Sequence, residues 1–319
     1  MMLDIVWVLA GLAMVVFGAD VLVGGASSLA RRFGVSEFVI GLTIVGFGTS
    51  LPELVVSVTG AIEGNSSVAI GNVLGSNIIN TIFILALSAL FMPVAISRTN
   101  KVRDIPVTIL ATLLVLALGL SSTLFGLGDA DGLSRVEALL LLLLFVAYII
   151  LCFKASPDAS GDSSGGKEHG TWTSVLLVLA GLALLIVGGR IFVNSAVNIA
   201  HGMGVSDKFI AVTILALGTS LPELATSIVA ISRKRSQMAL GNILGSNVFN
   251  LLLILGVSAL ISPMSFASVN LVDAAALALS IILVWAGVWT GKKNMLDRFD
   301  AAVMLLVFVA YMVWLFIKL

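Results

Sequence analysis

The chain has 319 residues, of which 59% are hydrophobic and only 11% are charged, and its formal net charge is zero. Soluble domains carry roughly 25% charged residues, so this composition excludes a soluble protein and indicates one that crosses a membrane many times. The net charge by itself is uninformative, and we expect no nucleic acid as a partner. The single cysteine, Cys152, excludes disulfides and cysteine-based metal sites within the chain.

Apolar runs of about 18 to 27 residues recur from end to end, and each can cross a hydrocarbon core about 30 Å thick. Backbone groups in lipid need internal hydrogen bonds, so we expect these runs to be helices. The first run has no basic residue before it, which favours a membrane span over a secretory signal peptide. In chain order, the ten predicted spans are about 4–23, 36–62, 67–91, 105–122, 135–153, 172–191, 208–231, 237–261, 271–290 and 299–317. The predicted fold class is an all-α membrane protein.

The basic residues favour one orientation of these spans. If the N-terminus lies outside, the inward-facing loops carry thirteen of the seventeen basic residues: Arg31, Arg32, Arg98, Lys101, Arg103, Lys154, Lys167, Arg233, Lys234, Arg235, Lys292, Lys293 and Arg298. The external side keeps Arg135, Arg190, Lys208 and Lys318. The positive-inside rule therefore predicts that both termini lie on the external, periplasmic side of a plasma (inner) membrane.

An offset of 170 residues aligns the first half of the chain with the second. GTSLPEL at 48–54 matches 218–224, GNVLGSNIIN at 71–80 matches GNILGSNVFN at 241–250, and 25 of the 53 positions from 41 to 93 are identical. Each half holds five predicted spans, so the second half should run in the opposite direction. Inverted repeats of this kind are typical of secondary transporters. We therefore predict a first repeat at 1–155, a flexible linker at 156–170 and a second repeat at 171–319.

The GTSLPE motifs predict breaks inside two spans. Proline lacks a backbone donor and its ring clashes with the carbonyl four residues before it. The breaks at Pro52 and Pro222 should expose carbonyl oxygens next to four hydroxyl groups, those of Thr49, Ser50, Thr219 and Ser220. Unwound backbone at membrane depth is tolerated where it lines a cavity, and such ends commonly bind cations.

Glu53 and Glu223 follow the two prolines. An ionisable residue within a span is costly and indicates a functional site. We expect no basic residue at their depth, so two facing carboxylates should bind a divalent cation, sodium ions or protons. Calcium suits these donors best, because it takes six to eight oxygen ligands, whereas magnesium tends to keep its waters.

The third and eighth spans carry a second polar motif. Residues four apart lie along one helical stripe, which groups Asn72, Ser76 and Asn80 in one half and Asn242, Ser246 and Asn250 in the other. Their neutral oxygens suit sodium. Asn77 and Asn247 lie off the stripe and are weaker candidates, whereas the neighbouring glycines, Gly71, Gly75, Gly241 and Gly245, should serve close helix packing.

Together, the paired motifs resemble the alpha-repeats of the calcium/cation antiporter superfamily, particularly prokaryotic sodium/calcium exchangers. The resemblance implies ten helices, with four motif-bearing helices at the centre and a sliding pair formed by a long first and a long sixth helix. It implies calcium bound by Glu53 and Glu223 with backbone oxygens at Thr49 and Thr219. The sodium positions it implies are Ser50, Ser76, Ser220, Ser246, Asn80 and Asn250, with the carbonyls of Gly46 and Ala216. Many relatives have aspartate at one of the two final asparagine positions, so the sodium count and the choice of sodium over protons stay open.

The predicted function is an antiporter that exchanges calcium for sodium by alternating access. A calcium/proton antiporter would use the same residues, and a passive cation channel is less favoured because of the inverted duplication. We expect no enzyme, because no histidine falls within a predicted span, and no cofactor. The expected partners are calcium and sodium ions (or protons) and membrane lipids, and the oligomeric state, a monomer included, is open.

Overall fold

The structure is a computed structural model that describes residues 2–154, 169–204, 216–290 and 294–318. The regular secondary structure of these residues is helical apart from four short strands. The first half contains α1 (Met2–Phe33), α2 (Glu37–Ile40), η1 (Gly41–Val45), α3 (Gly46–Thr49), α4 (Leu51–Ile62), α5 (Ser66–Ile78), η2 (Ile79–Leu85), α6 (Ala86–Phe91), β1 (Val94–Ala95), η3 (Asn100–Asp104), α7 (Ile105–Gly119), α8 (Ser121–Phe125), β2 (Gly132–Leu133) and α9 (Arg135–Lys154). The second half contains α10 (Thr171–Gly202), α12 (Ala216–Thr219), α13 (Leu221–Ser232), α14 (Ser236–Val248), η5 (Phe249–Ile254), α15 (Leu255–Ile261), β3 (Met264–Ser265), α16 (Leu271–Gly287), β4 (Met295–Leu296) and α17 (Arg298–Lys318).

Membrane-length helices dominate the described residues, which confirms an all-α membrane protein. Seven helices are long and apolar enough to cross a membrane, and the bent pair Glu37–Thr49 and Leu51–Ile62 makes an eighth. The other two predicted spans contain the shorter apolar helices α13 and α16. The start of the predicted span 208–231 and most of the predicted linker at 156–170 lie outside the described residues.

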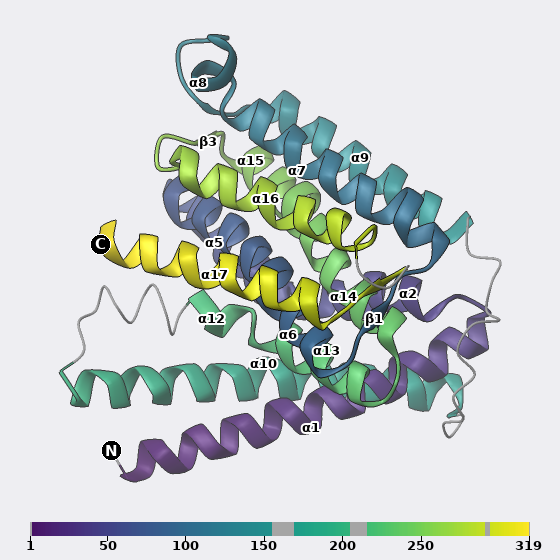
Figure 1. The fold of residues 1–319 in the computed structure, drawn as a ribbon. Coiled ribbons are helices and arrows are strands. Elements are labelled where there is room, and N and C mark those ends of the chain that lie inside the picture. Colours follow the sequence, from purple (N-terminus) through teal and green to yellow (C-terminus); the bar gives the residue numbers. More distant parts are fainter. Residues whose placement is uncertain (1, 155–168, 205–215, 291–293, 319) are drawn as a thin grey trace.

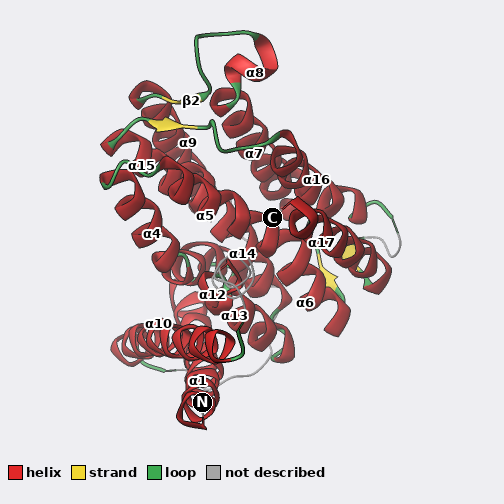
Figure 2. Cartoon of the chain, turned by 90° about the vertical axis from the view of Figure 1, so that its left-hand side faces the viewer, coloured by secondary structure: helices red, strands yellow, loops and turns green. Residues whose placement is uncertain are grey.

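Helices α1 and α10 lie side by side along one flank of the bundle (Figures 1 and 2). Both extend about ten residues beyond their predicted spans, to Phe33 and Gly202. The prediction ended too early because glycine, alanine and serine lower the hydropathy there. Of the residues beyond the predicted spans, Gly25 of α1 lies against the backbone of Ser174 and lets the two helices approach closely there.

The contacts between α1 and α10 also fix their relative direction. Gly11 lies against the carbonyl of Gly188, Gly18 against that of Gly181, and Gly25 against that of Ser174. As the residue number rises in α1 it falls in α10, so the two helices run antiparallel. Each helix is followed by a glycine in the left-handed region, Gly34 with φ of 62° and Gly204 with φ of 75°.

The remaining helices form a bundle in which the two halves interlock. The segments Ser66–Phe91 and Ser236–Ile261 are its most buried parts. The short strands pair between halves: β1 with β4, and β2 with β3, both antiparallel. The start of α1 and the end of α17 lie at the same end of the molecule (Figure 1). Both strand pairings thus join one half to the other.

Candidate cation-binding site

Both GTSLPE motifs break their helix as predicted. Helix α3 ends at Thr49 and α4 begins at Leu51, and the two parts of this span differ in direction by 49°. Ser50 lies at the break with φ −82° and ψ 6°, and Ser220 has nearly the same angles at the second break. Each proline lies in the first turn of the new helix, where a missing backbone donor costs little. Proline therefore starts a second helix here.

The breaks bring Glu53 and Glu223 into one buried site. Both side chains are 0% exposed. Glu53 Oε1 accepts a hydrogen bond from Ser76 Oγ of α5 at 3.2 Å, and Ser76 Oγ lies 3.1 Å from Ser220 Oγ of the other half. Glu223 Oε1 accepts from Ser50 Oγ, also across the halves, at 3.3 Å. Each carboxylate thus lies next to hydroxyl groups of both halves, Glu53 through Ser76 and Ser220 and Glu223 through Ser50.

Several oxygens in this site are buried without a hydrogen-bond partner among the described residues: Glu53 Oε2, Glu223 Oε2, Asn80 Oδ1 and Asn250 Oδ1. No arginine or lysine in the described chain forms an ion pair with either glutamate, and no three His, Cys, Asp or Glu residues cluster there. An unpaired buried oxygen is costly. Two carboxylates with neutral oxygens form a donor set that suits a hard cation such as calcium or sodium.

Thr49, Gly46 and Ser246 lie together on the other side of the break. Thr49 Oγ1 donates to Asn242 Oδ1 at 3.2 Å and to the Gly46 carbonyl at 3.3 Å. The same carbonyl accepts from Ser246 Oγ at 3.4 Å. The structure therefore brings the predicted Gly46 carbonyl next to Ser246. Ala216, at the equivalent position, is the first residue of α12, and its side chain lies outside the described part.

Asn80 and Asn250 end the polar stripes inside π-helical segments. Both are 0% exposed, and they lie at the second residue of η2 and η5 respectively. Asn250 Nδ2 donates to Asn77 Oδ1 at 3.0 Å and to Ser76 Oγ at 3.4 Å. Single π turns within α-helices are frequent at functional sites. Here Asn250 lies beside the serine that contacts Glu53, and both polar side-chain atoms of Asn80 are buried without a hydrogen-bond partner among the described residues.

Asn77 and Asn247, the weaker ligand candidates, make contacts between the two halves. Asn77 Nδ2 donates to the Asn247 carbonyl at 3.3 Å, and Asn247 Nδ2 donates to Thr81 Oγ1 at 2.7 Å. Both asparagines are buried and hold α5 and α14 together at the centre. Each lies off the polar stripe of its own helix and therefore faces the other helix. Their repetition in both halves was the signal that could have identified these contacts.

Asn72 and Asn242 support the helix breaks. Asn72 Nδ2 donates to the Glu53 carbonyl at 3.2 Å, and Asn242 Nδ2 donates to the Glu223 carbonyl at 3.3 Å. Each also donates to a serine hydroxyl of the broken helix, at Ser57 or Ser227, at 3.0 Å. These bonds fix the first turn of α4 and α13, and with it the direction of each glutamate.

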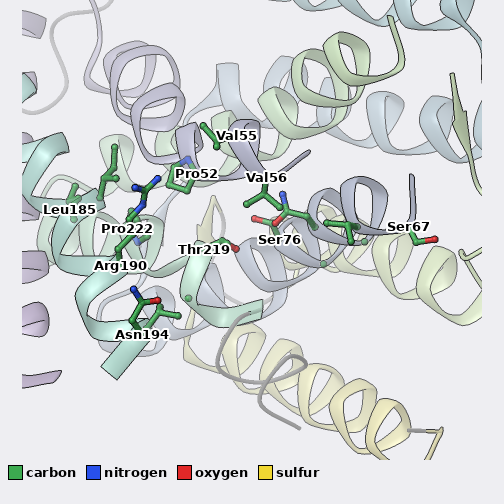
Figure 3. A pocket seen from close by; sticks show the side chains of 18 residues that line it. Pro52, Val55, Val56, Ser67, Ser76, Leu185, Arg190, Asn194, Thr219 and Pro222 are labelled. Carbon is green, nitrogen blue, oxygen red and sulfur yellow. The ribbon is translucent and has the colours of Figure 1, made fainter. Parts of the chain in front are cut away.

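A cavity of about 670 Å³ leads to the site from one side. It lies between α4, α5 and α10, as Figure 3 shows, and Ser76 and Thr219 are the predicted site residues on its wall. Gly71 and Gly75 also line it, and nothing lies within 4 Å of where their side chains would begin. Close packing was therefore a wrong prediction for these two glycines. It is confirmed for Gly241 and Gly245, which lie against the backbone of α2 and η1.

The cavity wall also contains Arg190, near the middle of α10. Arg190 borders the same cavity as Ser76 and Thr219 (Figure 3), but its side chain is exposed, and no ion pair of the described residues joins it to Glu53 or Glu223. Arg190 falls near the end of the predicted span 172–191, and α10 continues past it to Gly202.

Broken helices that meet at buried carboxylates define a membrane transporter of the cation-antiporter class. The profile of the family described as sodium/calcium exchanger protein matches residues 3–154 and 173–317. The putative antiporter CaxA of Alkalimonas amylolytica is 37% identical over 99% of both chains, and the sodium/calcium exchanger MaX1 of Methanosarcina acetivorans is 32% identical over 97% of both. The solved structure of the sodium-calcium exchanger NCX_Mj soaked with zero Na⁺ and Ca²⁺ covers 98% of this chain and 99% of its own, with a TM-score of 0.84 and 31% identity. The chain therefore belongs to the sodium/calcium exchanger protein family.

Proposed function

We propose that this protein exchanges calcium for sodium by alternating access at a single site around Glu53 and Glu223. The observation that carries the proposal is the arrangement of these two carboxylates. One comes from each half, both are fully buried, and the second oxygen of each is without a hydrogen-bond partner in the described chain. Two negative charges suit one calcium ion, and neutral oxygens such as those of Ser76 and Asn250 suit monovalent ions around them.

Competition for shared ligands would couple the two ions. Calcium neutralises both carboxylates in one step, and several sodium ions replace it in another. A partly filled site keeps an uncompensated charge, which makes crossing the membrane unfavourable. If more than two sodium ions exchange for each calcium, transport is electrogenic, with about 2.3 kcal/mol per net charge at 100 mV.

Two inverted five-helix repeats would supply the two access states. The family profile matches each half, α4 and α13 begin and end 170 residues apart, and α1 and α10 run antiparallel. Inverted repeats give alternating access when one part moves against the other. The membrane would be the plasma (inner) membrane, with both termini on the external side. The thirteen basic residues in the predicted inward-facing loops support this orientation.

The test is transport by the purified full chain in proteoliposomes. Vesicles loaded with sodium should take up radiolabelled calcium from sodium-free buffer when pH and membrane potential are clamped, and vesicles loaded with potassium or choline should not. Uptake that is equal with every internal cation would refute sodium exchange. Calcium flux that shows no trans-stimulation and no saturation would indicate a passive pore.

A calcium/proton antiporter is the second candidate, and a specific feature favours it. Asn80 and Asn250 are both neutral, so the site has only two carboxylates, and two protons on Glu53 and Glu223 could replace one calcium ion. Calcium uptake that is independent of sodium, follows an imposed pH gradient and collapses with a protonophore would support this candidate over sodium exchange.

A further inference from the structure

Two pairs of opposite charges occupy equivalent positions in the two halves. Asp20 of α1 and Arg190 of α10 are 170 residues apart, as are Arg233 and Glu63. Glu63 is the C-cap residue of α4 and Arg233 is the C-cap residue of α13. The acidic Asp20 on α1 therefore corresponds to the basic Arg190 on α10. The basic Arg233 after α13 likewise corresponds to the acidic Glu63 after α4.

The first of these charge pairs is joined in the structure. Arg233 forms an ion pair with Asp20, with side chains 38% and 45% exposed. A second ion pair, between Arg235 and Glu37, lies just beyond it and includes a bond to Ser27 of α1. Helices α1 and α13 are thus fastened to each other at this end of the molecule.

The equivalent interface, between α10 and α4, is separated by the cavity. Val55 and Val56 of α4 line one wall, and Arg190 and Asn194 of α10 line another (Figure 3). Among the ion pairs of the described residues, none joins Arg190 to Glu63, and both side chains are exposed. One interface is therefore closed with its charges paired, and its counterpart is open with its charges apart.

We propose that closure of the cavity brings Arg190 onto Glu63, and that this ion pair takes the place of Asp20–Arg233. Each pair would hold one access state, and the transition would exchange one for the other. An arginine within a span is expensive, which is explained if one state of the cycle neutralises it. The inference rests on the proposed alternating access, but it concerns the motion and is independent of which ion is coupled.

Crosslinking of the full chain in vesicles tests the pairing. On a Cys152→Ser background, the double variant Glu63→Cys/Arg190→Cys should be joined by a bifunctional maleimide about as long as the ion pair. The adjacent position on α4, Ile62, points to another face, so Ile62→Cys/Arg190→Cys is the matched control and should react more slowly. Adding Asp20→Asn removes the pair that holds the open state. It should speed the 63–190 crosslink by about two- to fivefold, the range for one partly exposed ion pair.

The opposite pair provides an independent measurement. A third cysteine, Val56→Cys, reports whether the cavity is open. It should react with a membrane-impermeant thiol reagent when Asp20→Cys/Arg233→Cys is crosslinked. It should be protected when Glu63→Cys/Arg190→Cys is crosslinked. Absence of a 63–190 crosslink in any ion condition, or a rate unchanged by Asp20→Asn, would overturn the inference. These readouts need no transport, so a protein that gates in this way but moves no calcium would refute the proposed function and leave the pairing intact.

Discussion

Neutralising one glutamate should remove most of the calcium affinity. In Glu223→Gln the side chain keeps its size but loses its charge. The native carboxylate is fully buried, and its described contacts include one hydrogen bond, from Ser50, to Oε1 and none to Oε2. Bound calcium would then face a single carboxylate, Glu53, and the site would hold one uncompensated positive charge. Removing one partner from a buried charge pair costs about 3–5 kcal/mol, which corresponds to roughly two to three and a half orders of magnitude in affinity.

Thermal unfolding in detergent, with and without calcium, measures this effect without transport. A ligand at 100 times its dissociation constant stabilises the folded state by about 2.7 kcal/mol, so the wild type should gain stability with calcium and Glu223→Gln should not. Without calcium the variant should be at least as stable as the wild type, because one of two neighbouring buried charges is gone. The control is Asp129→Asn, which removes an exposed loop carboxylate. Calcium stabilisation of Glu223→Gln equal to that of the wild type would refute the two-carboxylate site.

Three further substitutions test the surroundings of the site. Ser76→Ala removes a hydroxyl bonded to a carboxylate, an interaction worth about 1.5–3 kcal/mol, and should lower the apparent sodium affinity in calcium exchange by roughly tenfold to a hundredfold; an unchanged affinity would exclude it as a ligand. Asn242→Ala leaves several buried groups without their partner and should lower the unfolding free energy by about 2–3 kcal/mol, whereas retained thermal stability would contradict its supporting role. Gly241→Ala places a methyl group against the backbone of Phe38 and should lower the melting temperature, whereas Gly71→Ala faces open space and should not; equal losses would contradict the packing difference.

Much of the site could be predicted because its signals are local and repeated. A proline followed by glutamate in an apolar run indicates a broken helix with a buried carboxylate whatever surrounds it, and the 170-residue offset showed that this happens twice. The contact of Glu53 with Ser76 was not predicted and comes from the structure. The spans were located by hydropathy to within a few residues wherever a charged or turn residue ends the apolar run, as at Ile62 and Phe91.

The features that the sequence analysis missed depend on contacts between helices. The extension of α1 beyond residue 23 rests on close approach to α10, and hydropathy treats the small residues that permit this approach as weakly polar. The π segments at η2 and η5 turn Asn80 and Asn250 away from the positions that an ideal four-residue spacing gives. The place of Arg190 on the cavity wall depends on how α10 packs beside α4 and α5, which the sequence does not give.

The strongest argument for alternating access comes from equivalent motifs in unlike surroundings. The sequence GNxLGSN occurs in both halves, yet Gly241 and Gly245 are tightly packed whereas Gly71 and Gly75 border the cavity. The two helix interfaces show the same contrast. An ion pair joins α1 to α13, whereas the cavity separates α10 from α4. Identical local sequence gives no reason for this difference, so its cause must be the arrangement of the helices. A chain whose halves can exchange these arrangements at little cost would present its buried carboxylates to each side of the membrane in turn.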